Sequence, residues 1–185
     1  MLAAGGGNRR TVGAYPTMPP MGTGGTRAID VARRAGITFE VHEYAHDARS
    51  SLHEGGRGYA LEAVEALGLD PRRVFKTIVV GVDGGLALAV VPADAEVDLK
   101  AAADALGGRK AAIAPPADAE RATGYVLGGI SPLGTRRPLP LALDASASGW
   151  PSIHVSAGRR GLEIELAPAD LVRLTKGVLA PIARR

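Results

Sequence analysis

A glycine-rich stretch at residues 123–134 contains residue types that could do chemistry with the backbone alone. It reads Thr-Gly-Tyr-Val-Leu-Gly-Gly-Ile-Ser-Pro-Leu-Gly and carries no charged side chain. The pattern predicts a short apolar strand followed by a tight turn at Gly128 and Gly129, where another molecule can approach the N–H groups closely. The turn is either a β-bulge or barrel corner, or a ligand loop whose amides hold a carboxylate, phosphate or oxyanion. The lack of charge in a basic chain favours the ligand loop.

Lys76 is the one charged residue in a predicted apolar strand, residues 74–82. It shares a strand face with Val74, Ile78 and Val80, because side chains alternate between the two faces. Burial of an unpaired ammonium is costly. The side chain must therefore reach a pocket, pair with an acid, or extend past the end of the strand. Its position alone leaves these alternatives open.

Metal chemistry is not expected from the histidines. His42 and His46 are four residues apart, but on a strand that spacing spans about 13 Å, too far for one ion to bridge. His53 falls in a polar, glycine-bearing loop. His154 falls in a predicted strand, where we expect a packed side chain rather than a ligand. Without a carboxylate cluster near these histidines, the sequence predicts no metal and no cofactor.

Length and composition indicate one globular domain. The chain has 185 residues, of which 46% are hydrophobic, enough for a proper core. No apolar run approaches the roughly 20 residues of a membrane span, and the first ten residues lack the apolar core of a signal peptide. We therefore expect a cytoplasmic protein with no membrane partner. Residues 1–24, rich in Gly, Pro and Met, are expected to form a disordered tail before a single domain at 25–185.

Residue types that are absent or rare exclude several kinds of site. The chain has no cysteine, which excludes disulfides, thiolate metal sites and a protein thiol nucleophile. No Ser-His-Asp spacing is evident. Aromatic residues make up 4%, too few for a broad base-stacking platform. The pairs Arg136/Arg137 and Arg159/Arg160 suit phosphate contacts, although solvated surface charge is the commoner meaning.

Periodicity and turn signals predict alternating helices and strands. Helices are expected at residues 26–35, 60–67, 98–106 and 115–123 and from residue 167 onward. Strands are expected at 37–44, 74–82, 86–91, 110–114, 139–144, 150–156, 162–166 and 178–182, with hairpin turns at 83–85 and 157–161. This order indicates the α+β class, with a mixed, largely antiparallel sheet or partly closed barrel surrounded by helices.

Three blocks of sequence together resemble the YbaK/EbsC family. They are Phe75-Lys76-Thr77, the glycine-rich stretch with its Gly-Gly-Ile-Ser-Pro, and Val-Ser-Ala-Gly-Arg-Arg-Gly-Leu at 155–162. This family consists of free-standing trans-editing domains related to the insertion domain of bacterial prolyl-tRNA synthetase. The resemblance covers residues 26 to 184, and the pattern Thr-Gly-x-x-x-Gly-Gly-Ile-Ser-Pro favours the YbaK branch over relatives that edit alanine.

The resemblance implies a deacylase that hydrolyses mischarged Cys-tRNA(Pro), and also Cys-tRNA(Cys), by attack of the substrate thiol on its own ester. It implies no cofactor; the partners are aminoacylated tRNA and prolyl-tRNA synthetase, with no DNA. Glu163 falls where many members carry aspartate, and the loop at 48–58 is longer than usual. The implied catalytic residues are Lys76, Gly128 and Gly129, and the implied substrate-binding residues are Tyr44, Thr77, Ile130, Ser131, Ser156, Glu163, Arg136, Arg137, Arg159 and Arg160.

Two other functions remain open at this stage. One is a deacylase for another small amino acid such as alanine, because one or two pocket side chains decide such selectivity. The other is a non-enzymatic adaptor that binds tRNA or prolyl-tRNA synthetase. An adaptor would not need both Lys76 and the glycine-rich loop, which favours the enzyme.

Overall fold

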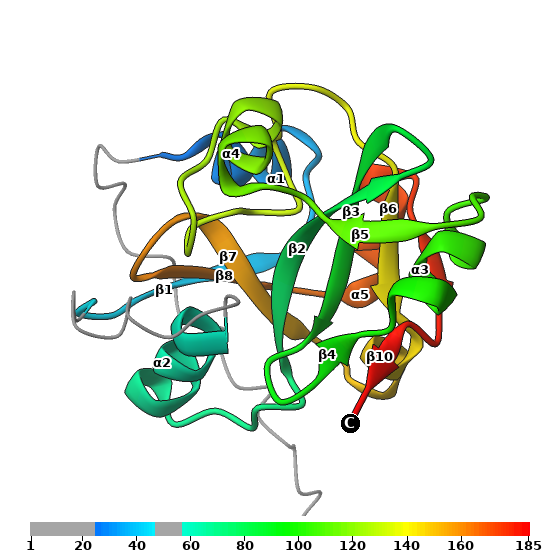
Figure 1. Ribbon diagram of the computed structural model, residues 1–185. Helices are drawn as coiled ribbons and strands as arrows, with labels where there is room; N and C mark the ends of the chain where they lie inside the picture. Colours follow the sequence, from blue (N-terminus) through cyan, green and yellow to red (C-terminus); the bar gives the residue numbers. More distant parts are fainter. Residues whose placement is uncertain (1–24, 47–56) are drawn as a thin grey trace, which may run out of the picture.

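The computed structural model describes residues 25–46 and 57–185 (Figure 1). The expected disordered tail at 1–24 and most of the loop at 48–58, including His53, lie outside the described residues. None of the described helices is long and apolar enough to cross a membrane.

Eight of the described strands form a mixed sheet at the centre of the domain (Figure 1). They are β1 (Phe39–Glu43), β2 (Val74–Val82), β3 (Gly85–Pro92), β5 (Ala111–Ile113), β6 (Leu141–Asp144), β7 (Ile153–Arg159), β8 (Leu162–Leu166) and β9 (Val178–Ala180). Their order is β1-β8-β7-β2-β3-β6-β9, with β5 paired to β2 beside this path. Parallel pairs are β2–β7, β3–β6 and β6–β9. A separate antiparallel pair joins β4 (Glu96–Val97) to β10 (Ala183–Arg184).

Helices cover both faces of this sheet. They are α1 (Arg27–Arg34), α2 (Arg57–Leu67), α3 (Leu99–Ala105), α4 (Pro116–Thr123), α5 (Pro168–Thr175) and the 3₁₀ helix η2 (Ala145–Gly149). Figure 1 shows α1 and α4 together at one end of the sheet, with α2 to the left and α3 to the right of β2 and β3 in this view. The predicted α+β class with a mixed, largely antiparallel sheet is confirmed.

Strand β2 is buried on both faces, as its apolar sequence predicts. Phe75 and Val79 pack in one cluster with the apolar sides of α1, α4 and α5. On the alternate face, Val74 packs against α2, whereas Val80 packs against α3. Lys76 lies on this second face between Val74 and Val80, where one helix cluster ends and the other begins.

Local sequence signals set several element ends where they were predicted. The Thr26 hydroxyl accepts the Ile29 N–H at the start of α1, and Asp98 caps α3 through the N–H groups of Lys100 and Ala101. Asp83 and Gly84 both have positive φ in the turn between β2 and β3, the geometry that suits a two-residue hairpin.

Two predicted elements were wrong. Residues 125–127 form part of a loop and not a strand, because Gly124 ends α4 with a left-handed backbone and Tyr125 turns into the core. The second error concerns the turn predicted at 157–161. Strand β7 continues past Ser156 to Arg159 through an irregularity in its pairing with β8, so the turn is confined to residues 160–161.

Candidate functional site

A cavity of about 790 Å³ lies where the α2 and α3 clusters meet on β2. It is lined by residues 74–79 of β2, by Tyr59 and Ala60 of α2, by Leu99 of α3, and by the glycine-rich loop. The structure brings seven predicted site residues to this cavity: Lys76, Thr77, Gly128, Ile130, Ser156, Arg160 and Glu163.

The Lys76 side chain ends in the cavity wall. It is 9% exposed, and its Nζ donates a hydrogen bond to the Ala93 carbonyl at 3.3 Å. The sequence left open whether this lysine reaches a pocket, pairs with an acid or extends out of the strand; in the structure it lines the cavity. The contact with Ala93 fixes the position of a cation beside the space that a ligand would fill.

Glu163 is a buried acid on the same wall. It pairs in register with Ser156 across β7 and β8 and is 7% exposed. Its Oε2 has no hydrogen-bond partner among the described residues. Burial raises the pKa of Glu163 to about 8, because low-dielectric surroundings disfavour the carboxylate. At neutral pH the side chain is therefore mostly the uncharged acid.

Tyr44 lies behind this acid and does not line the cavity. It packs beside the buried cluster of Val74 and the α2 alanines. Burial and then the charges of Glu163 and Glu62 raise the pKa of Tyr44, whereas its contact with Gly161 lowers it slightly. The phenol is therefore neutral, and its proximity to Glu163 makes it a neighbour of the site.

Close packing explains both central glycines. Gly128 has φ +81°, and a Cβ there would lie 2.7 Å from the Tyr59 ring. A Cβ at Gly129 would lie 2.8 Å from the Arg159 Cα. The Gly129 N–H donates to the Val126 carbonyl at 3.0 Å, whereas the Gly128 N–H donates to none of the residues that the structure describes. Of these two glycines, Gly128 lines the cavity, whereas the Gly129 N–H is already engaged within the loop.

Three hydrogen bonds and one cation–π contact hold the glycine-rich loop in place. The Tyr125 hydroxyl donates to the Leu133 carbonyl at 2.7 Å. Arg27 donates to the Gly124 carbonyl at 2.8 Å, and its guanidinium lies 4.6 Å from the Tyr125 ring centre. Arg160 donates to the Leu127 carbonyl at 2.8 Å. The loop is thus preorganised by long-range contacts, as a backbone binding site must be.

The remaining predicted residues lie away from the cavity. Ser131 is fully buried, and its hydroxyl accepts the Leu133 N–H. Arg136 and Arg137 are exposed, and Arg159 pairs with Glu43 at 2.7 Å. Of the four predicted phosphate contacts, only Arg160 reaches the cavity wall.

Sequence reasoning missed several residues that line the cavity: Tyr59, Glu96, Leu99, Ile113 and Arg184. Arg184 reaches the wall because β10 pairs with β4, where its guanidinium lies 2.9 Å from the Glu96 carboxylate. Such pairing across 88 residues leaves no local pattern. The contact between Tyr59 and Gly128 explains why residue 128 is a glycine, but the glycine alone does not indicate which side chain packs against it.

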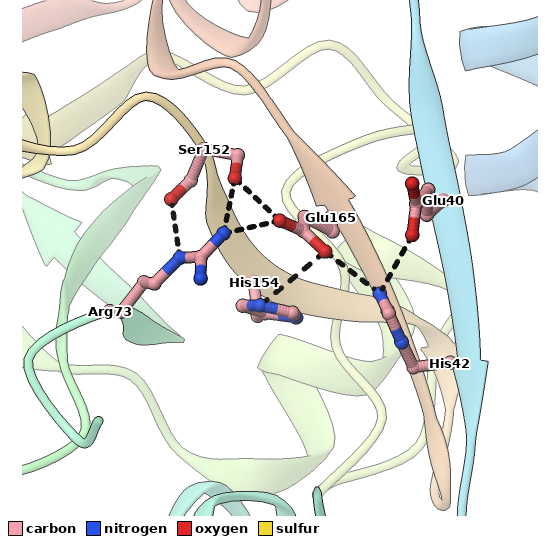
Figure 2. A network of polar contacts seen from close by, with 6 residues as sticks. All are labelled: Glu40, His42, Arg73, Ser152, His154 and Glu165. Carbon is pink, nitrogen blue, oxygen red and sulfur yellow. Dashed lines mark hydrogen bonds and ion pairs between the residues drawn. The ribbon is translucent and has the colours of Figure 1, made fainter. Parts of the chain in front are cut away.

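A second polar cluster surrounds Glu165 (Figure 2), which lies two residues after Glu163 on β8. Glu165 contacts Arg73 and Ser152 through Oε1. Its Oε2 lies 2.9 Å from His42 Nε2 and 3.7 Å from His154 Nε2. Burial alone would raise the pKa of Glu165, but the Ser152 hydrogen bond and the neighbouring histidine and arginine contacts lower it overall. The premise that no carboxylate lies near these histidines was wrong.

The cavity residues set limits on its chemistry. No histidine is among the described lining residues, and burial raises the pKa of Glu163 to about 8. Among the described residues, neither cavity hydroxyl, Thr77 or Ser156, is hydrogen-bonded to a histidine or carboxylate base. The wall instead offers a lysine ammonium, a backbone amide and a buried acid. These groups suit an acyl ester that is already activated, since such a substrate needs positioning and oxyanion stabilisation more than a strong nucleophile. A wall of this kind suits an enzyme that cleaves activated acyl groups.

Comparison with known proteins identifies the family. Residues 53–174 match the model of the aminoacyl-tRNA editing domain. The chain is 37% identical over 161 residues to the candidate Cys-tRNA(Pro)/Cys-tRNA(Cys) deacylase EbsC of Enterococcus faecalis, covering 86% of this chain and 94% of that protein. The chain therefore belongs to the aminoacyl-tRNA editing family, and its resemblance to YbaK/EbsC is confirmed. It is an aminoacyl-tRNA deacylase.

Two further relatives are informative. The multifunctional Ser/Thr-tRNA deacylase ProXp-y of Escherichia coli is 32% identical over 98 residues, 52% of this chain and 59% of that protein. A crystal structure described as a candidate trans-editing enzyme for prolyl-tRNA synthetase superposes with a TM-score of 0.71 at 24% identity, covering 86% of this chain and 96% of that one. The superposition supports the fold alone.

Proposed function

We propose that this chain removes cysteine from mischarged Cys-tRNA(Pro), and from Cys-tRNA(Cys), with the substrate thiol as nucleophile. The observation that carries the proposal is that, among the described residues, neither cavity hydroxyl, Thr77 or Ser156, is hydrogen-bonded to a histidine or carboxylate base, in a chain without cysteine. A cysteinyl ester brings its own nucleophile, whose ordinary pKa of about 8.5 leaves a few per cent as thiolate at neutral pH. The Enterococcus faecalis relative bears the name of this activity.

In the proposed reaction, the thiolate sulfur bonds to the ester carbonyl carbon, and the bond from that carbon to the terminal ribose oxygen breaks. The ribose oxygen takes up the proton released by the thiol, and cysteine leaves as a cyclic thioester that water opens. The Lys76 ammonium and the Gly128 N–H stabilise negative charge on the carbonyl oxygen. Glu163 Oε2, which has no hydrogen-bond partner among the described residues, accepts a hydrogen bond from the α-ammonium of the cysteine, and this cation would favour the ionised form of the acid.

Arginines account for tRNA binding in this proposal. Arg160 lines the cavity and is fixed by the Leu127 carbonyl, so it can meet a phosphate of the acceptor end. Exposed Arg136 and Arg137 add longer-range attraction that salt would weaken. The supplier of mischarged tRNA would be prolyl-tRNA synthetase in the cytoplasm.

The test is single-turnover hydrolysis of Cys-tRNA(Pro) and of its S-methyl-cysteinyl analogue. We expect rapid loss of cysteine, no loss of S-methylcysteine, and a decrease of about 10²–10³-fold for Lys76→Ala, the usual cost of one oxyanion contact. Lys110→Ala is the matched control, because Lys110 is exposed. Cleavage of the S-methyl ester at the wild-type rate would contradict the thiol mechanism.

A second candidate substrate is a seryl or alanyl ester. The Escherichia coli relative is named for serine and threonine, and a pocket discriminates only modestly between small side chains. Ser-tRNA(Pro) and Ala-tRNA(Pro) therefore belong in the same assay. Their cleavage would show that water, and not the substrate thiol, attacks the ester.

A further inference from the structure

The polar cluster around Glu165 contains side chains that could bind a metal ion. Nitrogen atoms of His42 and His154 and an oxygen of Glu165 all lie within 4.8 Å of one another. The three residues come from β1, β7 and β8, which are neighbours in the sheet. Paired strands, and not a loop, therefore fix their relative positions. None of the three lines the catalytic cavity.

The distances fit coordination of a single ion. Zinc bonds of about 2.0–2.2 Å at tetrahedral angles separate neighbouring ligand atoms by about 3.3–3.6 Å. Glu165 Oε2 lies 2.9 Å from His42 Nε2 and 3.7 Å from His154 Nε2, which brackets this range. Figure 2 shows the two histidines approaching the same carboxylate oxygen from different strands. Small side-chain rotations would bring all three atoms around one ion.

His154 provides an independent sign of a ligand. Its side chain is 1% exposed, and neither ring nitrogen has a hydrogen-bond partner among the described residues. Buried polar atoms in folded proteins nearly always have a partner. The ring faces Glu165 and His42, whose own ring centre is 5.0 Å away. An ion between these groups would satisfy one of the two nitrogens.

The surroundings include outer contacts that orient Glu165 and a carboxylate that could supply a fourth ligand. Arg73 and Ser152 hold Oε1 of Glu165 and so orient Oε2 toward the histidines, as outer contacts do in known sites. Glu40 lies opposite Glu165 in register, and its carboxylate is 4.0 Å from His42 Nε2. Glu40 is 75% exposed and His42 28% exposed, so an ion can enter from solvent. The positive charge of Arg73 would reduce the affinity for a cation. Arg73 contacts Oε1 of Glu165, whereas the histidines lie near Oε2.

We propose that His42, His154 and Glu165 bind a divalent transition-metal ion of the zinc type, with Glu40 or water as the fourth ligand. Two imidazoles and a carboxylate suit Zn²⁺ or Co²⁺, whereas Mg²⁺ and Ca²⁺ prefer oxygen ligands alone. The ion would join the edge strand β1 to β7 and β8. The site is separate from ester cleavage and goes beyond the deacylase activity.

The test is calorimetric titration of the full chain, first freed of metal with a chelator, with Zn²⁺ and with Mg²⁺ as the comparison ion. We expect one Zn²⁺ per chain and no heat from Mg²⁺, with Co²⁺ giving the visible spectrum of a tetrahedral site. His42→Ala and Glu165→Gln should each weaken binding about 10–100-fold or more. His46→Ala is the matched control, since His46 pairs with Glu62 at 2.9 Å outside the cluster.

Each outcome decides for or against the site. Circular dichroism of every variant separates lost binding from lost folding, and His42→Ala decides if Glu165→Gln fails to fold. Zn²⁺ should also raise the melting temperature of the wild type and not that of His42→Ala, because only a folded site binds the ion. The proposal fails if the wild type does not bind Zn²⁺, if His42→Ala binds as the wild type does, or if His46→Ala removes binding.

Discussion

Glu163 and Glu165 are two residues apart on β8 and face the same side of the sheet, yet their surroundings differ. Glu163 Oε2 has no hydrogen-bond partner among the described residues, and burial raises the pKa of this acid to about 8. Both oxygens of Glu165 have polar neighbours, and these lower its pKa despite burial. The difference teaches that an acid with an unsatisfied oxygen beside a cavity suits binding of an organic substrate, whereas an acid held by an arginine, a hydroxyl and two histidines suits a structural role or an ion site.

The largest effect expected from this contrast is on the pH dependence of stability. Folded Glu163 keeps its proton up to about pH 8, whereas in the unfolded chain it loses the proton near pH 4.5. The folded state thus binds more protons between these values, so the free energy of unfolding falls as the pH rises through this window. Over this window the fall amounts to at most about 5 kcal/mol, and Glu163→Gln should remove it.

Urea unfolding from about pH 5 to pH 9 measures the difference between Glu163→Gln and the wild type. The contribution of His154, whose pKa burial lowers to about 4, runs in the opposite direction and is lost as the pH falls below about 6.5. It is common to both proteins and cancels in the difference. A difference that does not grow between pH 5 and pH 8 would mean that Glu163 is ionised in the folded protein.

The next effect concerns Glu165. Glu165→Gln leaves Arg73 without its anionic partner in a half-buried setting, and loss of one member of such a pair costs roughly 2–3 kcal/mol. The loss should be constant above about pH 5, because the lowered pKa of Glu165 keeps it ionised there. Urea unfolding with a chelator present tests this without metal. If the variant and the wild type have equal free energies of unfolding, Glu165 has no structural role.

The variant Gly128→Ala tests whether deacylation needs the tight turn at residue 128. Gly128→Ala adds left-handed strain and a contact of 2.7 Å with the Tyr59 ring, so we expect a loss of about 1–2 kcal/mol and strongly reduced deacylation. Gly36→Ala is the matched control, because Gly36 has φ +64° but no atom within 4 Å of the added Cβ. It should lose about 1 kcal/mol and keep full activity. Equal activities would show that the loop tolerates movement.

The sequence predicted those features that depend on residues close together in the chain. The turn at Asp83 and Gly84, the caps at Thr26 and Asp98, and the buried faces around Lys76 all rest on neighbouring residues. Family motifs also predicted Glu163 and Gly128 as site residues, and both reach the cavity.

Long-range pairing decided the rest. Glu165 meets His42 and His154 only because β8 lies between β1 and β7, and Arg184 reaches the cavity only through β10. The apolar residues at 125–127 were mistaken for a strand because Tyr125 is buried as an anchor of the loop, with its hydroxyl on the Leu133 carbonyl. Apolar character alone does not distinguish an anchor from a strand.

The smallest expected effect on stability is that of Arg159→Ala, although the sequence predicted the same phosphate contact for Arg159 and its neighbour Arg160. Arg159 pairs with Glu43, and both side chains are more than half exposed. Arg159→Ala should therefore change stability by less than about 1 kcal/mol and leave single-turnover deacylation unchanged. Arg160 lines the cavity and holds the Leu127 carbonyl, so Arg160→Ala should weaken tRNA binding, with a lower salt dependence of that binding. If both variants bind tRNA equally well, the phosphate contact lies elsewhere, and exposed Arg136 and Arg137 become the residues to test.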